Sequence, residues 1–128
     1  MEKSQALIVV VDDDASMRQA IVRLLGAGGF SVMAFDSAEA LSASPCLQRA
    51  DCLVLDMRLP GQHGHHFYAS LAKPRPPALF VSADDSAACR RMALGAGGAG
   101  FLAKPFEGSA LLNWVATATQ SNPSNPQR

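Results

Sequence analysis

Short apolar runs alternate with amphipathic stretches along nearly the whole chain. The first run, residues 7–11, is continuous and rich in β-branched side chains, which is typical of a strand covered on both faces. Residues 15–27 follow, and their large apolar side chains recur at the spacing of one helix face. The same order recurs along the chain. It predicts strands at 7–11, 31–35, 52–55, 78–81 and 101–103, and helices at 15–27, around 38–41, at 64–72, at 87–94 and at 107–119.

Polar, glycine and proline residues mark the ends of these elements. Gly28 and Gly29 follow the first helix, and Pro45 is expected to end the second. Residues 73–77, with three prolines, cannot be helical and are expected to form a connector. The expected caps are Asp14, Asp36 or Ser37, and the set Asp84, Asp85 and Ser86. Five strand–helix units predict one α/β domain with a parallel sheet, helices on both faces and a ligand site at the carboxyl ends of the strands.

The glycines between 95 and 100 fit the spacing G-x-G-x-x-G of a dinucleotide-binding loop. That motif has meaning only between a strand and a following helix, whereas here it follows a helix and precedes a strand. It also needs an acidic residue further downstream, and Glu107 is the last acid in the chain. The glycines are therefore interpreted as a helix end and a tight turn.

Composition narrows the function classes. The chain has 128 residues, of which 48% are hydrophobic, and its 11 basic and 11 acidic residues give a formal net charge of zero. A neutral chain has no general attraction to nucleic acid or anionic lipid, so DNA binding by this domain itself is not expected. No apolar run could span a membrane, and the first five residues do not suggest a secretory signal. Three cysteines without a C-x-x-C pattern suggest reduced thiols, so we expect a cytoplasmic protein.

A coherent set of polar residues stands at the ends of the predicted strands. Asp12 and Asp13 follow the first strand, Asp56 the third and Ser82 the fourth, while Lys104 follows the fifth. Three carboxylates at one sheet edge repel one another, and a divalent cation such as Mg²⁺, which prefers oxygen ligands, would relieve that repulsion. A cation, a lysine and a hydroxyl around one carboxylate can hold a phosphoryl group in transfer. The expected product is an acyl phosphate on Asp56.

The motifs around these residues resemble a known family. VVVDDD at 9–14, LVLDMRLPG at 53–61, VSA at 81–83 and GFLAKPF at 100–106 are similar to the receiver domain of two-component response regulators. The resemblance covers about residues 7 to 119. It implies a flavodoxin-like (β/α)5 fold with a five-stranded parallel sheet in the order 2-1-3-4-5. We expect the receiver domain to span residues 1–120 and residues 121–128 to be a flexible tail or the start of a linker.

The resemblance also assigns a role to each polar residue. It implies that Asp56 is the phosphoacceptor and that Asp13, Asp56 and the backbone carbonyl of Arg58 bind Mg²⁺, or Mn²⁺ in its place. Asp12 would bind the ion through water, and Lys104 would pair with the phosphoryl oxygens.

Switching is implied in the same way. Ser82 would move toward the phosphoryl group, and Phe101, where many relatives have tyrosine, would swing inward behind it. This changes the surface made by the fourth helix, fifth strand and fifth helix. The bond between Lys104 and Pro105 is expected to be cis.

Other residues depart from the family pattern or leave alternatives open. Arg58 and Asp84 stand where side chains influence hydrolysis of the acyl phosphate, and we hypothesise that they pair across the site. Arg90 and Arg91 are expected to be solvated on a surface where receivers meet partners. Trp114 could belong to the core or be an exposed dimer contact.

Three histidines stand close together at 63, 65 and 66. Such a group could bind a transition metal. Because neighbouring side chains at 65 and 66 should diverge on a helix, we expect solvated loop histidines instead.

The expected function is a phosphoacceptor module that takes a phosphoryl group from a sensor histidine kinase or phosphotransfer protein. It is not an enzyme, apart from Mg²⁺-dependent self-phosphorylation and autodephosphorylation. Its expected partners are an output domain or target protein, and a phosphorylation-dependent homodimer. One alternative is an aspartyl phosphatase of the haloacid-dehalogenase type, which needs a second aspartate where Arg58 stands. Another is the receiver of a longer DNA-binding transcription regulator.

Overall fold

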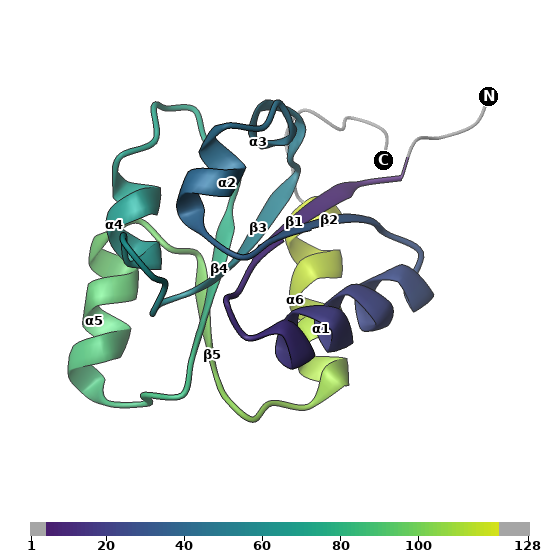
Figure 1. Cartoon of the computed structure of the whole chain (residues 1–128). Coiled ribbons are helices and arrows are strands. Elements are labelled where there is room, and N and C mark those ends of the chain that lie inside the picture. Colours follow the sequence, from purple (N-terminus) through teal and green to yellow (C-terminus); the bar gives the residue numbers. More distant parts are fainter. Residues whose placement is uncertain (1–4, 121–128) are drawn as a thin grey trace.

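A five-stranded parallel sheet lies between two layers of helices (Figure 1). This computed structural model describes residues 5–120, so the predicted tail at 121–128 lies outside the described residues. The sheet order is β2-β1-β3-β4-β5, which confirms the predicted order 2-1-3-4-5. The strands are β1 (Leu7–Val11), β2 (Ser31–Phe35), β3 (Cys52–Asp56), β4 (Ala78–Ser82) and β5 (Gly100–Ala103).

The side chains of each strand pack alternately into two separate hydrophobic cores, because successive residues of a strand point to opposite faces of the sheet. On one face the strand side chains pack under α1 (Ala15–Ala27) and α6 (Gly108–Gln120). The other face is covered by α2 (Ala38–Ser42), α3 (Cys46–Arg49), α4 (Gly64–Ala69) and α5 (Ala87–Gly95). Both layers are visible in Figure 1. The buried strand residues are Ile8, Val10, Cys52, Val54, Leu79 and Val81 on the first face, and Val9, Val11, Leu53, Leu55, Ala78 and Phe80 on the second.

Side-chain caps fix where three helices begin. The Asp14 carboxylate accepts hydrogen bonds from the backbone N–H groups of Ser16 and Met17 at the start of α1. Ser37 rather than Asp36 caps α2. Ser86 caps α5. These bonds satisfy N–H groups that have no partner within the helix, which is why short polar residues mark the boundaries in the sequence.

The structure differs from the prediction at several element ends. The helix α2 ends at Ser42, before Pro45 is reached, and Pro45 is instead the N-cap of α3, a short helix that was not predicted. Proline is favoured near the start of a helix, and Cys46, the first residue of α3, packs into the core. The helix α4 ends at Ala69, and not at 72 as predicted. Near this end, the Arg75 guanidinium donates a hydrogen bond to the carbonyl of Tyr68. The strands β3 and β4 each extend by one residue, to Asp56 and Ser82.

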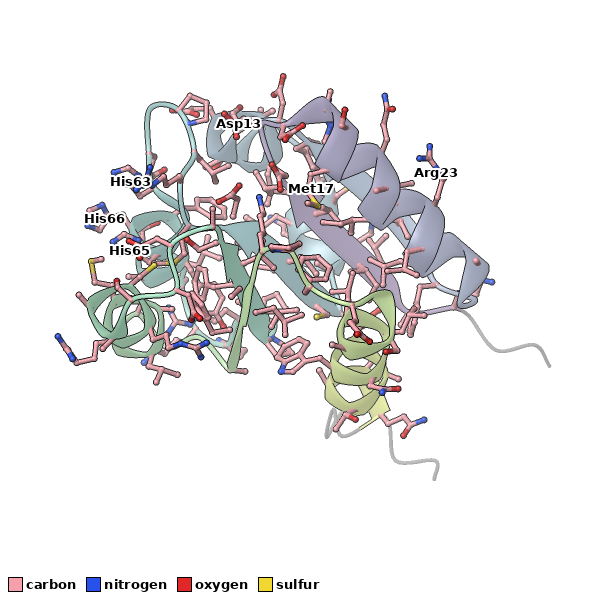
Figure 2. The ribbon with its side chains drawn as sticks, turned by 90° about the horizontal axis from the view of Figure 1, so that it is seen from below. Asp13, Met17, Arg23, His63, His65 and His66 are labelled. Atoms are coloured by element: carbon pink, nitrogen blue, oxygen red, sulfur yellow. The ribbon has the colours of Figure 1, made fainter. Side chains whose placement is uncertain are left out.

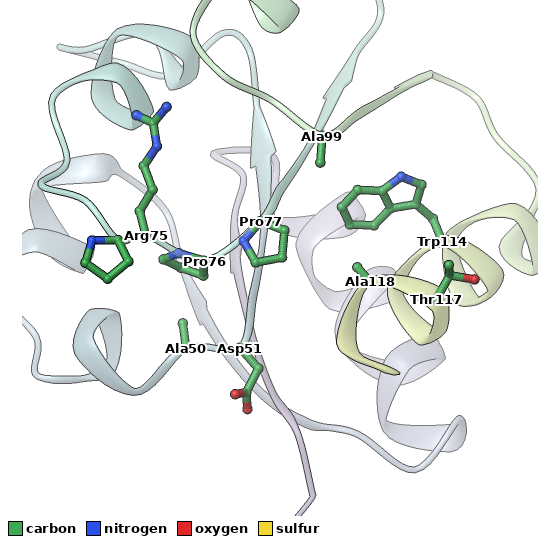
Figure 3. A pocket seen from close by; sticks show the side chains of 10 residues that line it. Ala50, Asp51, Arg75, Pro76, Pro77, Ala99, Trp114, Thr117 and Ala118 are labelled. Carbon is green, nitrogen blue, oxygen red and sulfur yellow. The ribbon is translucent and has the colours of Figure 1, made fainter. Parts of the chain in front are cut away.

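A cavity of about 540 Å³ lies at the amino-terminal edge of the sheet (Figure 3). Trp114 forms one wall, and the proline connector at 74–77 forms another. The indole packs so closely on Gly100 that a Cβ there would lie 2.3 Å from its Nε1 atom. Trp114 is therefore partly a core residue of the α1–α6 side.

Gly97 has a φ of +99° between α5 and β5, as expected for a tight turn and not for a dinucleotide loop. Within residues 5–120, no helix combines the length and apolar character needed to cross a membrane.

Candidate functional site

The carboxyl ends of β1, β3, β4 and β5 meet around an open pocket of about 430 Å³. The sheet order puts β1 and β3 side by side at the centre, where side chains far apart in the sequence converge. The pocket is lined by Asp13, Asp14, Asp56, Arg58, Ser82, Ala83, Asp84 and Lys104. Most of the strand-end set predicted from the sequence therefore lies in one pocket, and Asp12, which does not line it, is hydrogen-bonded to Lys104, which does.

Three carboxylates form the acidic part of the pocket. Asp12, Asp13 and Asp56 each offer one oxygen, and these atoms all lie within 4.8 Å of one another. Asp12 and Asp56 are buried, whereas Asp13 is exposed at the pocket mouth. Convergent carboxylate oxygens with one side open to water fit Mg²⁺, which keeps several waters when bound by protein.

Lys104 connects the two buried acids. Its Nζ atom donates to Asp12 Oδ2 at 3.0 Å and to Asp56 Oδ2 at 2.9 Å. Burial disfavours the charged amine, but the hydrogen bonds and charges of Asp56 and Asp12 outweigh it and raise the pKa of Lys104. The lysine therefore stays charged at neutral pH and partly neutralises the carboxylate cluster.

Burial raises the pKa of Asp56 above its ordinary value. Hydrogen bonds from Lys104 and from the Arg58 backbone N–H, at 3.0 Å, act in the opposite direction, while the Asp12 charge adds to the rise. The folded protein thus holds a proton on Asp56 more tightly than the unfolded chain does.

This raised pKa predicts a stability change in Asp56→Asn. A carboxyl group with a raised folded pKa lowers stability as pH rises from its unfolded pKa through its folded pKa. Without divalent ions, Asp56→Asn should therefore unfold at higher urea than the unchanged chain at pH 7. The difference should shrink as pH falls through the folded pKa, and it should vanish below about pH 3, well under the unfolded pKa of about 3.9, where the aspartate is neutral in both states. A variant less stable at pH 7 would mean that the Lys104 contact outweighs the burial cost.

Ser82 closes the pocket from β4. Its hydroxyl is buried, accepts a hydrogen bond from the Asp84 backbone N–H at 2.9 Å and lies 3.6 Å from the Cys89 thiol. Cys89 belongs to α5, so this hydroxyl joins the pocket wall to that helix.

Phe101 on β5 is half-buried and packs against the core under α2 to α5. The Arg90 guanidinium lies over its ring, 4.7 Å from the centroid, and also donates to Asp85 at 2.8 Å from Nε. Arg90 is exposed, which confirms the predicted solvated position, and it makes this ring contact in addition. Nothing in the sequence indicates the contact, because it depends on how α5 lies against β5.

The hypothesised pair between Arg58 and Asp84 is absent. Both side chains line the pocket, but the ion pairs within residues 5–120 join Arg90 to Asp85 and Lys104 to Asp12 and Asp56. Backbone and side-chain hydrogen bonds from Ser86 are the main reason that the pKa of Asp84 is lowered, and the Arg58 charge contributes least. The two groups therefore do not shield the pocket in this structure.

The prediction that the side chains of His65 and His66 diverge was wrong, whereas the predicted exposure to solvent is observed for His63 and His66. His63 precedes α4, and His65 and His66 lie in its first turn. The rings of His65 and His66 do not diverge: their centroids are 4.3 Å apart, and His63 lies within 6 Å of both. In Figure 2 the three rings lie together at the α4 edge of the molecule, apart from Asp13.

Two backbone features complete the pocket. The Lys104–Pro105 peptide bond is cis. Gly64, at the start of α4, packs so tightly that a Cβ there would lie 2.1 Å from the Asp56 carbonyl oxygen. Gly64 could not be recognised from the sequence, since a glycine near other turn residues does not indicate that the start of a helix packs on the end of β3.

Comparison with known proteins gives consistent results. The family model described as response regulator receiver domain matches residues 8–116. The chain is 35% identical to nodulation protein W of Bradyrhizobium diazoefficiens over 91% of this chain and 52% of that protein. It is 37% identical to the transcriptional regulatory protein FixJ of the same organism, over 87% of this chain and 55% of that protein. The chain thus spans about half the length of these curated relatives.

Solved structures show the same fold. A response regulator receiver protein from Burkholderia phymatum is 36% identical, with a TM-score of 0.78 over 93% of this chain and 99% of that one. The BeF3-activated DrrB receiver domain gives a TM-score of 0.84 at 21% identity, over 91% of this chain and 99% of that one, which supports the fold alone.

Proposed function

The chain belongs to the response regulator receiver domain family, and from this we propose that Asp56 accepts a phosphoryl group from a sensor histidine kinase or phosphotransfer protein. A carboxylate oxygen of Asp56 attacks the phosphorus atom in line. The bond from phosphorus to the donor imidazole nitrogen breaks, and that nitrogen keeps the electron pair. The product is an acyl phosphate on this chain and a free histidine on the donor.

The observation that carries this proposal is the environment of Asp56 among the three acids. Asp56 lines the pocket, and both of its carboxylate oxygens accept a hydrogen bond. The Arg58 backbone N–H donates to Oδ1, and Lys104 donates to Oδ2. Asp12 is fully buried and does not line the pocket. Asp13 has no hydrogen bond from Lys104 to orient it. Asp56 is therefore the acid that is both held in position and open to a donor.

The acidic residues fit a divalent cation that supports this step. We propose that Asp13 and Asp56 bind Mg²⁺ directly, together with the backbone carbonyl of Arg58, and that Asp12 binds it through water. Mn²⁺ would use the same oxygen ligands. When bound, the ion neutralises charge on the transferring phosphoryl oxygens. Lys104 already lies against Asp56 and would stabilise another of those oxygens.

A direct test needs neither the natural kinase nor the signal. The unchanged chain is incubated with acetyl phosphate and Mg²⁺, and intact and peptide mass spectra locate any added phosphoryl group. We expect one group per chain, on the peptide that contains Asp56, and no modification when Mg²⁺ is replaced by a chelator. A phosphoryl group on another residue would contradict the proposal.

Mg²⁺ should also stabilise the fold. An ion that binds only the folded state at about 100 times its dissociation constant adds about 2.7 kcal/mol to the free energy of unfolding. We expect Asp13→Asn to lose most of this gain, because the substitution removes an exposed carboxylate of the acidic cluster. Asp14→Asn is the matched control, since Asn caps a helix as well as Asp does. Urea denaturation with and without Mg²⁺ measures the difference, and equal gains in both variants would count against the site.

We propose that the switch uses Ser82 and Phe101. Movement of the Ser82 hydroxyl toward the phosphoryl group would release its contact with Cys89, and Phe101 would turn inward from under Arg90. The affected face consists of α5, β5 and α6, which are the fourth helix, fifth strand and fifth helix of the prediction, because α3 was not predicted. An output domain, a target protein or a second phosphorylated copy would bind there, in the cytoplasm.

Receiver domains are signalling modules and not ordinary enzymes. We propose that the catalytic activity of this chain itself is limited to Mg²⁺-dependent self-phosphorylation and autodephosphorylation. The aspartyl phosphatase alternative lacks support, because exposed Arg58 stands where that class needs an acid. Since one curated relative is called a transcriptional regulatory protein, a transcriptional output is a further part of the proposal.

A further inference from the structure

The histidine cluster, His63, His65 and His66, is a group of metal-ligating side chains outside the acidic pocket (Figure 2). His63 holds the N-cap position of α4, with extended backbone, and His66 is the third residue of the helix. Side chains at these two positions meet on the same side of a helix start. The rings of His63 and His66 are 5.9 Å apart, and the ring of His65 lies 4.3 Å from that of His66, although the sequence predicts that the side chains at 65 and 66 diverge.

His65 is the inner member of the cluster. Its Nδ1 atom is buried and has no hydrogen-bond partner among the described residues. A buried polar atom without a partner costs about 1–3 kcal/mol, so a ligand that reaches this nitrogen would recover that cost. Imidazole nitrogens are common metal ligands.

The ring separations agree with a shared ion. Zinc lies about 2.0–2.1 Å from a histidine nitrogen, so the centres of two rings on one tetrahedral ion are about 5 Å apart. The observed separations of 4.3, 5.8 and 5.9 Å lie on either side of that value. The ring nitrogens do not yet converge, unlike the acidic oxygens, but His63 and His66 are exposed and can turn about their side-chain bonds.

We propose that the histidine cluster binds one divalent transition-metal ion of the Zn²⁺ class, independently of the Mg²⁺ site. Nitrogen ligands favour such ions, whereas the carboxylates of the acidic pocket favour Mg²⁺. The three cysteines are all buried and free of disulfides, so they do not compete for the ion in the folded protein. An ion on these residues ties the N-cap of α4 to its first turn. Gly64 lies between the ligands and packs on the Asp56 carbonyl, so the ion would also hold the start of α4 against β3.

The proposal is tested by titrating the untagged chain with Zn²⁺ in excess Mg²⁺ and measuring the heat of binding by isothermal titration calorimetry. We expect one Zn²⁺ per chain with micromolar affinity, and visible absorption bands when Co²⁺ replaces Zn²⁺. The double variant His63→Gln, His66→Gln should weaken binding by about tenfold or more, because even losing an outer-shell partner costs that much. Both side chains are exposed, so the variant should keep the fold, which circular dichroism checks.

Asp13→Asn is the control for the acidic pocket and should bind Zn²⁺ as the unchanged chain does. Three results would overturn the proposal. They are no Zn²⁺ binding in excess Mg²⁺, equal affinity in the double histidine variant, or loss of binding in Asp13→Asn.

Discussion

Asp56→Asn is expected to abolish phosphoryl uptake from acetyl phosphate. The amide has nearly the same shape but lacks the carboxylate oxygen that attacks phosphorus. Asp12 cannot replace it, because that side chain is fully buried and bonded to Lys104 and to the Asp14 backbone N–H. Intact mass after incubation with acetyl phosphate and Mg²⁺ should show no added phosphoryl group at times when the unchanged chain is fully modified.

Asp36→Asn is the matched control for this experiment. Asp36 is exposed, follows β2 and does not line the pocket, so the variant should be modified at the normal rate. Thermal unfolding shows whether both variants are folded. Continued modification of folded Asp56→Asn, with the group on Asp12 or Asp13, would mean that the acceptor has been wrongly assigned.

Gly64→Ala is expected to cause the largest loss of stability among simple substitutions in the site. The new Cβ would lie 2.1 Å from the Asp56 carbonyl oxygen and 3.0 Å from its carbon, and both are backbone atoms. The Gly64 backbone N–H also donates to the Met57 carbonyl at 3.0 Å, which holds the two segments together. Overpacking of this kind costs about 1–3 kcal/mol or more. Urea denaturation measures the loss directly.

Gly26→Ala is expected to increase stability, in contrast to Gly64→Ala. Gly26 lies inside α1, and a Cβ there would meet nothing within 4 Å. Alanine is about 1 kcal/mol more favourable than glycine within a helix, so this variant should be more stable than the unchanged chain. If Gly64→Ala were equally stable, α4 could move away from β3 at little cost, and the close packing would not constrain the pocket.

The central part of the fold is predictable from local sequence because burial leaves a direct pattern. The β1 run must be apolar throughout, since its side chains enter both cores, and Asp12 marks where the strand reaches the sheet edge. Parallel strands then carry Asp12, Asp56 and Lys104 to the same edge, although up to 92 residues separate them.

Features that depend on packing between elements could not be predicted in this way. The short helix α3 packs into the core through Cys46, and the local sequence does not indicate this packing. The Arg90 contact with Phe101 requires α5 to lie beside β5, and the absent pair between Arg58 and Asp84 depends on side-chain directions around an open pocket. Each of these sequences is compatible with more than one local arrangement, and tertiary contacts select the one observed.

The contact of Lys104 with two acids has a consequence for the order of events. Asp12, Asp13 and Asp56 carry three negative charges and Lys104 one positive charge, so this cluster has a formal charge of −2. An anionic donor approaching that cluster is repelled, whereas a divalent cation is attracted and brings the formal charge to zero. We therefore expect ordered addition, with the cation first and the donor second. Raising the ionic strength should then slow donor capture only a little when the cation is saturating.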